Sequence, residues 1–403
     1  PSSITTIGDS AFENCIRLQG HDTLQNRMIL FPNTEEIGKR AFYGCHLLSS
    51  IRIVNSLHTV GEEAFAECIG LTEIYYGNEP SLTTLSNNLF KGCTSLQNFR
   101  FAKSITSING NPFSGCENLA GFTVDSGNQY YEVEDNQGIN VLYNIFQTEN
   151  EGGEEGDEEE IPYGNKRTIV LFPSGVSTDF QVPADVENIA SYAFYTSRIT
   201  RLTFAEGEFL EIGDYAFAQN SLLTEIAISE RVKKIGDYAF YNCSGLSEIT
   251  INPAGDNDNT LIIGDNAFSH NNISQLIIPE RVTHIGKYAF YASYNLAGID
   301  FTQTENSAQP LVIDDYAFAD CSQITQLILP SRLEEINDFA FSWCVGLENI
   351  VFTPGDESLK LGSYVFDNCH FLKEMFLPAR LVEMGSYIFS SCYNLETVEF
   401  QSL

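Results

Sequence analysis

The sequence has few basic residues and lacks long apolar runs. It contains 21 Lys and Arg against 54 Asp and Glu, which gives a formal net charge of −33. Such a surface repels phosphate groups, which argues against nucleic acid and anionic lipid headgroups as partners. Because no run of about eighteen apolar residues occurs, we expect no segment to insert directly into a membrane.

Motifs that carry catalysis or metal binding are also missing. The six histidines form no HExxH motif, the ten cysteines include no CxxC pair, and no glycine-rich phosphate-binding fingerprint appears. A function has to be argued from a site, and none of these is present. We therefore expect a non-enzymatic protein that needs no cofactor and no metal.

What the sequence does contain is a repeat related to Ile-Gly-x-x-Ala-Phe. Five copies form a first block and nine a second, with spacings of 22 to 30 residues inside the blocks, which is the range of leucine-rich repeats. Glycine usually follows the aliphatic residue, as at Gly8, Gly38, Gly213 and Gly286, where we expect turns with positive φ. The motif phenylalanines are Phe12, Phe42, Phe65, Phe90, Phe113, Phe194, Phe217, Phe240, Phe268, Phe290, Phe318, Phe341, Phe366 and Phe389.

A short strand is predicted after each motif. In Leu246-x-x-Ile249-x-Ile251, apolar residues alternate with polar ones, which predicts one buried and one solvent-facing side. Each repeat is too short to bury its apolar face alone, so neighbouring repeats must stack. The expected fold is an α/β leucine-rich-repeat solenoid, a curved right-handed superhelix with one short parallel strand per repeat, short helical or irregular turns and a phenylalanine spine.

The ten cysteines all lie three residues after a motif phenylalanine. The remaining four copies carry Ser197, Asn220, Asn271 and Ser293 at that place, so the position accepts a small, weakly polar group. Side chains stacked in parallel stay near the ~4.8 Å strand spacing, whereas disulfides prefer about 3.8 Å between Cβ atoms. We therefore expect free thiols that face neighbouring backbone.

The repeat resembles a known family. The segment Ile235-Gly-Asp-Tyr-Ala-Phe-Tyr-Asn-Cys-Ser-Gly-Leu-Ser-Glu-Ile-Thr-Ile251 resembles the BspA-like leucine-rich repeats of bacterial surface proteins. The resemblance covers nearly the whole chain, because Phe, Cys and Leu keep fixed offsets over many copies. It implies a cell-surface or extracellular bacterial location and a role in adhesion. It brings no catalytic motif, and it names no ligand because ligands vary within the family.

An interruption separates the two blocks. We expect repeats over 1–124 and 186–403, with a β-hairpin-like insertion over 125–185 in which apolar runs at 141–143 and 168–173 flank a polar loop. The acidic stretch 149–160 is expected to be a solvated loop rather than a calcium site, since no calcium-loop spacing is present. Both ends fall within the repeat pattern without a polar cap, so we expect the sequence to be a piece of a longer protein.

Candidate binding residues lie between the last two inward positions of each strand. In the first block Arg52, Tyr75 and Arg100 should stack on successive repeats, and Tyr and Arg are favoured anchors of interfaces. In the second block these positions form an apolar stripe broken by an aspartate, and its members are Ile277, Ile328, Val351 and Phe376. The alternatives are that β-branched and aromatic residues merely suit strands, or that the stripe meets a second copy of the chain.

A third stripe consists of tyrosines two residues before the motif phenylalanine. Packing with the hydroxyl left in water is the preferred interpretation, and a platform for stacking sugars is the alternative. The stripe consists of Tyr192, Tyr215, Tyr238, Tyr288, Tyr316, Tyr364 and Tyr387.

The function expected from these patterns is a binding module that recognises an extracellular protein or glycan of a host or neighbouring cell. Two alternatives remain at this stage. The chain could be a structural spacer that presents another domain, or a surface component that binds glycans specifically.

Overall fold

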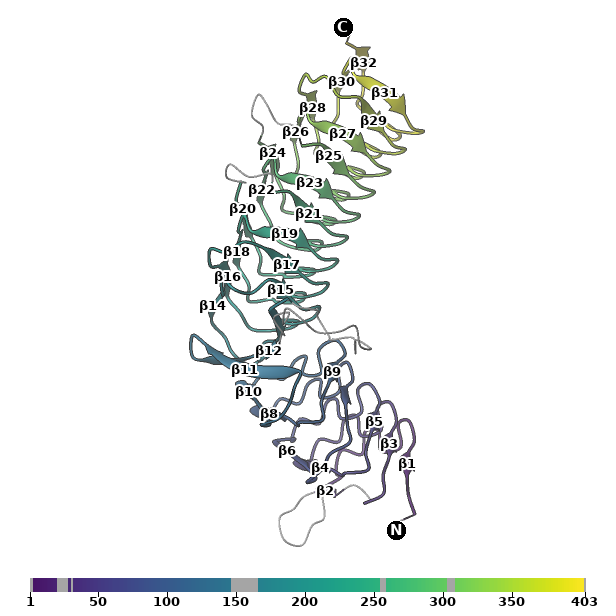
Figure 1. Cartoon of the computed structure of the whole chain (residues 1–403). Coiled ribbons are helices and arrows are strands. Elements are labelled where there is room, and N and C mark those ends of the chain that lie inside the picture. The colour runs from purple at the N-terminus through teal and green to yellow at the C-terminus, as the bar shows by residue number, and fades with distance from the viewer. Residues whose placement is uncertain are drawn as a thin grey trace, which may run out of the picture. The chain divides into compact units, whose positions relative to one another are not determined.

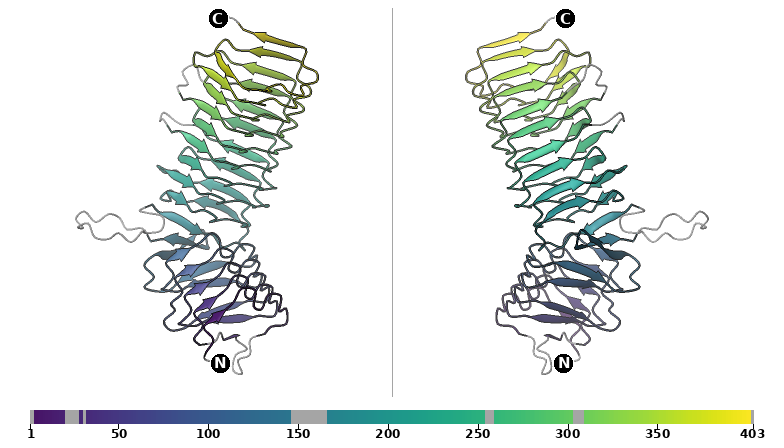
Figure 2. Two further views of the ribbon diagram at one scale, coloured as in Figure 1. Left: turned by 90° about the vertical axis from the view of Figure 1, so that its right-hand side faces the viewer. Right: turned by 90° about the vertical axis from the view of Figure 1, so that its left-hand side faces the viewer.

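The computed structural model describes most of the chain as two compact units (Figures 1 and 2). The first unit consists of Pro1–Ser177 and Val186–Arg198, and the second of Thr178–Asp185 and Ile199–Leu403. The acidic stretch 149–160 lies outside the described residues, so the prediction for it is not addressed. The described residues are 3–19, 28–29, 32–145, 166–253, 259–302 and 309–401.

Repeats of the first unit contribute two short strands each, where one had been predicted. The predicted strands follow the motif leucine, and a second row of two-residue strands precedes the motif glycine. Neighbouring strands within each row pair in parallel, in the sheets β2-β4-β6, β8-β10, β1-β3-β5 and β7-β9. The first row comprises β2 (Met28–Ile29), β4 (Ser50–Ile53), β6 (Glu73–Tyr76), β8 (Asn98–Phe101) and β10 (Gly121–Val124), and the second β1 (Thr6–Ile7), β3 (Glu36–Ile37), β5 (Thr59–Val60), β7 (Thr84–Leu85) and β9 (Ser107–Ile108).

The interruption in the repeat folds as an antiparallel insertion inside the first unit. Strands β11 (Tyr131–Asn136) and β12 (Ile139–Asn144) form a hairpin, and β12 also pairs antiparallel with β13 (Thr168–Leu171). On its outer sides the insertion continues the sheet, because β10 pairs with β12 and β13 pairs with β15 (Asn188–Ile189), both in parallel.

The residues that follow β13 make the contacts that a regular repeat would make with its neighbours. The ring of Phe172 stacks on Phe194 at 4.7 Å, in the manner of the motif phenylalanines. The Ser174 hydroxyl donates to the carbonyl oxygens of Phe113 and Cys116, each at 3.1 Å. The insertion therefore extends the buried stack as well as the sheet.

The second unit has the same two rows. Its first row forms the sheets β14-β16-β18-β20, β22-β24-β26-β28 and β30-β32, and its second row runs without a break from β17 to β31. The first row comprises β14 (Asp179–Val182), β16 (Arg201–Phe204), β18 (Glu225–Ile228), β20 (Glu248–Ile251), β22 (Gln275–Ile278), β24 (Gly298–Phe301), β26 (Gln326–Leu329), β28 (Asn349–Phe352), β30 (Glu374–Leu377) and β32 (Thr397–Phe400). The second comprises β17 (Leu210–Ile212), β19 (Val232–Ile235), β21 (Leu261–Ile263), β23 (Val282–Ile285), β25 (Leu311–Ile313), β27 (Leu333–Ile336), β29 (Leu359–Leu361) and β31 (Leu381–Met384).

Of the helical or irregular turns that were predicted, the helical form is not observed, since the part of the chain that the structure describes holds no helix. With the exception of Asn111, the residues two before and two after each motif phenylalanine have left-handed φ, as at Arg40 (55°) and Gly44 (69°). Backbone amides then alternate between partners: Tyr43 donates to Arg40 within the turn, while Phe42 donates to Ala64 of the next repeat. Because the amides bond between coils instead of along a helix, the molecule is a β-solenoid of stacked coils rather than an α/β repeat protein.

Glycine stands in the motif for a different physical reason from the positive φ that was predicted. Gly8, Gly38, Gly213 and Gly286 are not among the residues with positive φ. Instead, neighbouring coils approach closely at Gly38 and Gly286: a Cβ atom on Gly38 would lie 2.5 Å from the backbone nitrogen of Asp9. One on Gly286 would lie 2.7 Å from the carbonyl carbon of Gly264. The expectation of positive φ at these glycines is wrong, and at Gly38 and Gly286 the neighbouring coil leaves no room for a side chain.

The core of each unit is the predicted phenylalanine spine with the cysteine ladder beside it. Phe240, for example, stacks on Phe217 at 5.0 Å and on Phe268 at 5.1 Å. The Cys243 thiol donates to the carbonyl oxygen of Phe217 at 3.1 Å, while Asn271 donates its amide to the carbonyl of Phe240 at 3.0 Å. All ten cysteines are free thiols, as predicted, and each one from Cys45 onward donates to a backbone carbonyl of the neighbouring coil. Burial raises the pKa of Cys68 to about 12, so such thiols are poor nucleophiles.

Candidate binding sites on the strand-lined face

The three residues singled out in the first block lie on the solvent side of neighbouring strands. Arg52 of β4 is directly opposite Tyr75 of β6, and Arg100 of β8 is opposite Thr123 of β10. Arg52, Arg100 and Thr123 are exposed, and Tyr75 is half-buried. Alternation along the strands produces this placement, because the residues on either side of Arg100 are the buried Phe99 and Phe101.

A hollow of about 490 Å³ opens on this face. Tyr75 and Arg100 both line it, together with the amide side chains of Gln97 and Asn98 and the hydroxyl of Thr123. Arg52 is not part of its wall. Two of the three predicted residues are thus brought together in one concave site, and the third lies beside it on the adjoining strand.

Local ion pairing offsets the positive charge of Arg100. The Arg100 guanidinium lies 3.4 Å from the Asp125 carboxylate and 5.6 Å from the centre of the Tyr76 ring. The Tyr75 hydroxyl donates a hydrogen bond to the Glu73 carboxylate. In the hollow, the charge of Arg100 therefore lies close to Asp125 and that of Glu73 close to the Tyr75 hydroxyl. The remaining polar side chains of the wall are neutral amides and hydroxyls.

A second hollow, of about 480 Å³, adjoins the first through their shared residue Thr123. Its wall includes Asp125 and, from the hairpin, Glu132 and Asn140. The sequence did not indicate these residues as part of a site, because they belong to the insertion, where the repeat register that identified the other positions is lost.

The apolar stripe of the second unit also lies on the solvent side. Ile277 is directly opposite Asp300, and Ile328 is opposite Val351. Their exposed fractions decide that these are surface residues: Ile277 is 51%, Ile328 48%, Val351 47% and Phe376 40% exposed. These four residues lie on the solvent side of their strands, as predicted, and Asp300 interrupts the stripe between Ile277 and Ile328.

The tyrosine stripe is occupied by contacts within its own row. Tyr288, Tyr316, Phe339, Tyr364 and Tyr387 form one continuous stack, with successive ring centroids 4.7, 4.6, 4.5 and 4.9 Å apart. Since each inner ring is sandwiched between two others, its faces are not available to a sugar. The geometry supports the packing interpretation.

The stack does not stop where the row lacks an aromatic residue. At the position of Asn266 a detour of edge-to-face contacts joins Tyr238 to Tyr288. The rings of the detour are Tyr241, His270 and Tyr291, with neighbouring centroids 5.5 Å apart.

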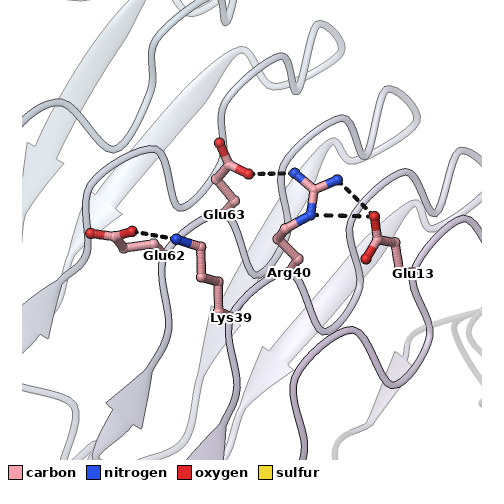
Figure 3. A network of polar contacts seen from close by, with 5 residues as sticks. All are labelled: Glu13, Lys39, Arg40, Glu62 and Glu63. Carbon is pink, nitrogen blue, oxygen red and sulfur yellow. Dashed lines mark hydrogen bonds and ion pairs between the residues drawn. The ribbon is translucent and has the colours of Figure 1, made fainter.

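In the first unit the equivalent edge carries charges instead of rings (Figure 3). Arg40 lies between two coils and contacts Glu63 on one side and Glu13 on the other, at 2.6 and 2.7 Å. Lys39 pairs with Glu62 at 3.0 Å. These bonds join successive coils across their turns, so the network holds the repeat in register rather than forming a ligand site.

Sequence reasoning missed a set of buried arginines in the second unit. They occur just before alternate strands of the second row, and each donates to backbone carbonyls about two repeats earlier. Arg332, for example, donates to the carbonyl oxygens of Val282 and Pro279 at 2.7 and 3.2 Å. Removal from water lowers the pKa of Arg332 to about 10. The set is Arg231, Arg281, Arg332 and Arg380, and the recurrence of Arg-Val or Arg-Leu at intervals near fifty residues was the signal that could have found it.

Two further findings concern chemistry and membranes. Within the described ranges, no group of three or more His, Cys, Asp or Glu side chains is arranged to hold a metal ion. In the same ranges no helix has the length and apolarity needed to cross a bilayer.

The chain was compared with known proteins. A family model described as a BspA type leucine rich repeat region, in six copies, matches residues 1–30, 21–136, 172–297 and 307–403. No curated protein has a similar sequence.

Several solved bacterial structures have similar coils. A leucine-rich repeat protein from Bacteroides ovatus is 20% identical with a TM-score of 0.54, and the match covers 95% of this chain and 87% of that one. A leucine rich cell surface protein from Faecalibacterium prausnitzii is 21% identical with a TM-score of 0.45, covering 88% and 78%. The Bacteroides structure supports the solenoid fold, and the family model confirms the resemblance found in the residues.

Proposed function

The chain belongs to the BspA-type leucine-rich repeat family, and on that basis we propose that it is a non-catalytic adhesion module of a bacterial surface or secreted protein. Proteins of this type are generally protein-binding surface proteins. The module would bind an extracellular protein or glycan of a host or neighbouring cell through its strand-lined face.

The observation that carries this proposal is the solvent-facing row Arg52, Tyr75 and Arg100, of which Tyr75 and Arg100 line a hollow of about 490 Å³. A concave site of this size that presents an aromatic ring, a guanidinium and several neutral polar groups is typical of recognition rather than of packing. A structural spacer needs no such surface, so the spacer is the weaker alternative.

The apolar stripe supports a second contact area in the other unit. Ile277, Ile328, Val351 and Phe376 are each at least 40% exposed on consecutive or near-consecutive strands. Aliphatic and aromatic side chains grouped in this way contribute to binding when a partner removes them from water. The partner could be the same macromolecule or a second copy of the chain.

Binding to immobilised extracellular-matrix proteins and glycans at physiological salt tests the proposal. The wild type is compared with Tyr75→Ala/Arg100→Ala, with Ile328→Ser/Val351→Ser, and with the control Tyr393→Ala, whose ring is 78% exposed away from the strands. We expect binding that the control keeps and that at least one of the double variants loses, with circular dichroism unchanged.

The alternatives give different results. Silence of the wild type across the panel would favour the spacer, and binding unaffected by either double variant would remove the strand-lined face as the site. Self-association by the wild type that Ile328→Ser/Val351→Ser abolishes, measured by analytical ultracentrifugation, would assign the apolar stripe to a second copy of the chain.

A further inference from the structure

We propose that the hollow bounded by Tyr75, Gln97, Asn98 and Arg100 is a binding site for a neutral saccharide unit. This inference rests on the proposed function and names the ligand class for the strand-lined face of the first unit. Four features of the hollow support it: its charge balance, its unused hydrogen-bonding groups, its half-buried aromatic ring and its continuation into a second hollow.

Charge balance argues against an ionic ligand. The positive charge of Arg100 lies 3.4 Å from Asp125, and the negative charge of Glu73 accepts a hydrogen bond from Tyr75. An anionic ligand would have to displace Asp125 and would approach a chain with a net charge of −33. A cationic ligand would find Glu73 already engaged. A neutral ligand meets neither obstacle.

The neutral polar groups of the wall are the ones still available. The side chains of Gln97, Asn98, Ser95 and Thr123 make no hydrogen bond to another residue in the described part of the chain, and all four line the hollow. Each amide offers both a donor and an acceptor, and each hydroxyl does the same. A polyhydroxylated ring presents the same mixture, with several hydroxyl groups that donate and accept at once.

An apolar surface is also present. Tyr75 is half-buried on the wall of the hollow, so its ring gives that wall an apolar part beside the polar side chains, while its hydroxyl is bound to Glu73.

The size and continuation of the site favour a chain of sugars over a single one. The hollow of about 490 Å³ lies within the range of small-molecule sites, and a further hollow of about 480 Å³ adjoins it at Thr123. Asn140 of the hairpin and Asp125 contribute to the second wall, so its polar groups also suit hydroxyls. An oligosaccharide that follows the face from β6 toward β12 would occupy both.

Saturation-transfer NMR with a panel of neutral sugars tests the site. The probes are glucose, galactose, mannose, N-acetylglucosamine and their β-linked disaccharides, and the protein is the full chain. We expect transfer to at least one probe, with tighter binding of a disaccharide than of its monosaccharide. The affinity should be nearly the same at low and at physiological salt, because a neutral ligand forms no screened ion pair.

The variant Gln97→Ala/Asn98→Ala removes two of the available amides, and we expect it to weaken binding by about tenfold or more, equivalent to about one hydrogen bond or two. The matched control is Gln326→Ala/Asn349→Ala, because these exposed amides lie opposite each other at the starts of β26 and β28 in the other unit. The control should bind as the wild type does.

Several results would overturn the inference. These are no transfer from any probe, unchanged binding by the Gln97/Asn98 variant, or binding restricted to uronic acids and sulfated sugars that disappears with salt. If no sugar binds while an immobilised protein is still captured and Tyr75→Ala/Arg100→Ala abolishes the capture, the saccharide site is wrong and the proposed function stands. If nothing in either assay binds, both are wrong.

Discussion

Many turns of this solenoid place a residue with a side chain in the left-handed backbone conformation, which such residues do not favour. Ala292 is buried at a φ of 55°, while Ala289, three residues earlier in the same repeat, is buried without positive φ. A left-handed conformation costs a residue with a side chain about 1–2 kcal/mol, and glycine adopts it freely. Replacing each of these two alanines by glycine removes one buried methyl group, but only the change at Ala292 also relieves backbone strain.

We expect Ala292→Gly to raise the free energy of unfolding by about 1 kcal/mol, because the relieved strain exceeds the extra entropy that glycine loses on folding. Ala289→Gly should lower it by about 1 kcal/mol, since no strain is relieved there. Urea denaturation of both variants measures the difference. Equal destabilisation by the two substitutions would show that the left-handed turns are not strained.

A second residue-scale feature is the ion pair of His284 with Asp314, whose Nε2 and Oδ2 atoms lie 3.0 Å apart. The hydrogen bond to Asp314 raises the pKa of His284, and the same bond lowers the pKa of Asp314. The raised histidine pKa stabilises the fold fully below the unfolded value of about 6.5, and this contribution is lost as the pH rises through the folded value. The lowered pKa of Asp314 stabilises the fold above the unfolded value of about 4, and this contribution is lost as the pH falls through the folded value.

Asp314→Asn is therefore expected to lower the pKa of His284, which a histidine-selective NMR titration measures. Asp265→Asn is the comparison, because Asp265 contributes only a weaker Coulombic attraction, and its removal should shift the titration less. The stability of the wild type relative to Asp314→Asn should fall as the pH rises from 6 through the folded histidine pKa. A titration of His284 that does not respond to Asp314→Asn would contradict the pairing.

At the scale of the element, the buried arginines act as long clamps across coils. Arg332 reaches the carbonyl oxygens of Val282 and Pro279, and Arg380 reaches those of Leu333 and Pro330. Both arginines are more than nine-tenths buried. Carbonyl oxygens left without these donors would be buried and unpaired, which is costly.

Arg332→Leu should lower the free energy of unfolding by about 3 kcal/mol, because it removes two charge-assisted hydrogen bonds and leaves their acceptors unpaired. Arg332→Lys should recover only part of this, since an ammonium cannot reproduce the fork of the guanidinium. The control is Arg201→Ala, whose ion pair with Glu225 is about half exposed, and a loss below about 1 kcal/mol is expected there. Thermal and chemical denaturation give the values, and equal losses at the two sites would contradict a clamp.

The sequence predicts a strand only when the strand is long enough to show the alternation of buried and exposed residues. The strands of the first row were predicted, because four residues suffice to show alternation, as in β8 with its exposed Asn98 and Arg100. Two-residue strands such as β5 have no period to detect. The left-handed conformation of the turns was not predicted, because residues such as Tyr238 and Thr196 are not glycines and give no local signal of it.

The candidate site shows the same limit. Alternation determines which side of the strand Arg52, Tyr75 and Arg100 occupy, so their place on the solvent side could be predicted. The pairing of Arg100 with Asp125 could not, because Asp125 follows the end of β10 and its direction depends on the chain after the strand. The second hollow depends on contacts of the hairpin with β10, which repeat periodicity cannot describe.

At the scale of the whole molecule, the dominant feature is the excess of negative charge. With 54 acidic and 21 basic residues, repulsion among carboxylates opposes folding wherever few cations intervene. Parallel stacking adds to this, because the same position of successive repeats often carries an acid. Glu225 and Glu248 are directly opposite each other on β18 and β20, for example. Ion pairs such as those of Arg40 offset the repulsion locally.

We expect the midpoint of thermal unfolding to rise by a few degrees between low and physiological salt, because the screening length falls from roughly 30 to 8 Å and the repulsion with it. Glu248→Lys replaces one like-charge pair with an opposite one and should stabilise the protein at low salt by about 0.5 kcal/mol. That advantage should shrink as salt is added, so the variant should also depend less on salt than the wild type. If salt instead lowered the midpoint of the wild type, attraction within ion pairs such as Arg40 with Glu13 and Glu63 would outweigh the repulsion of the whole chain.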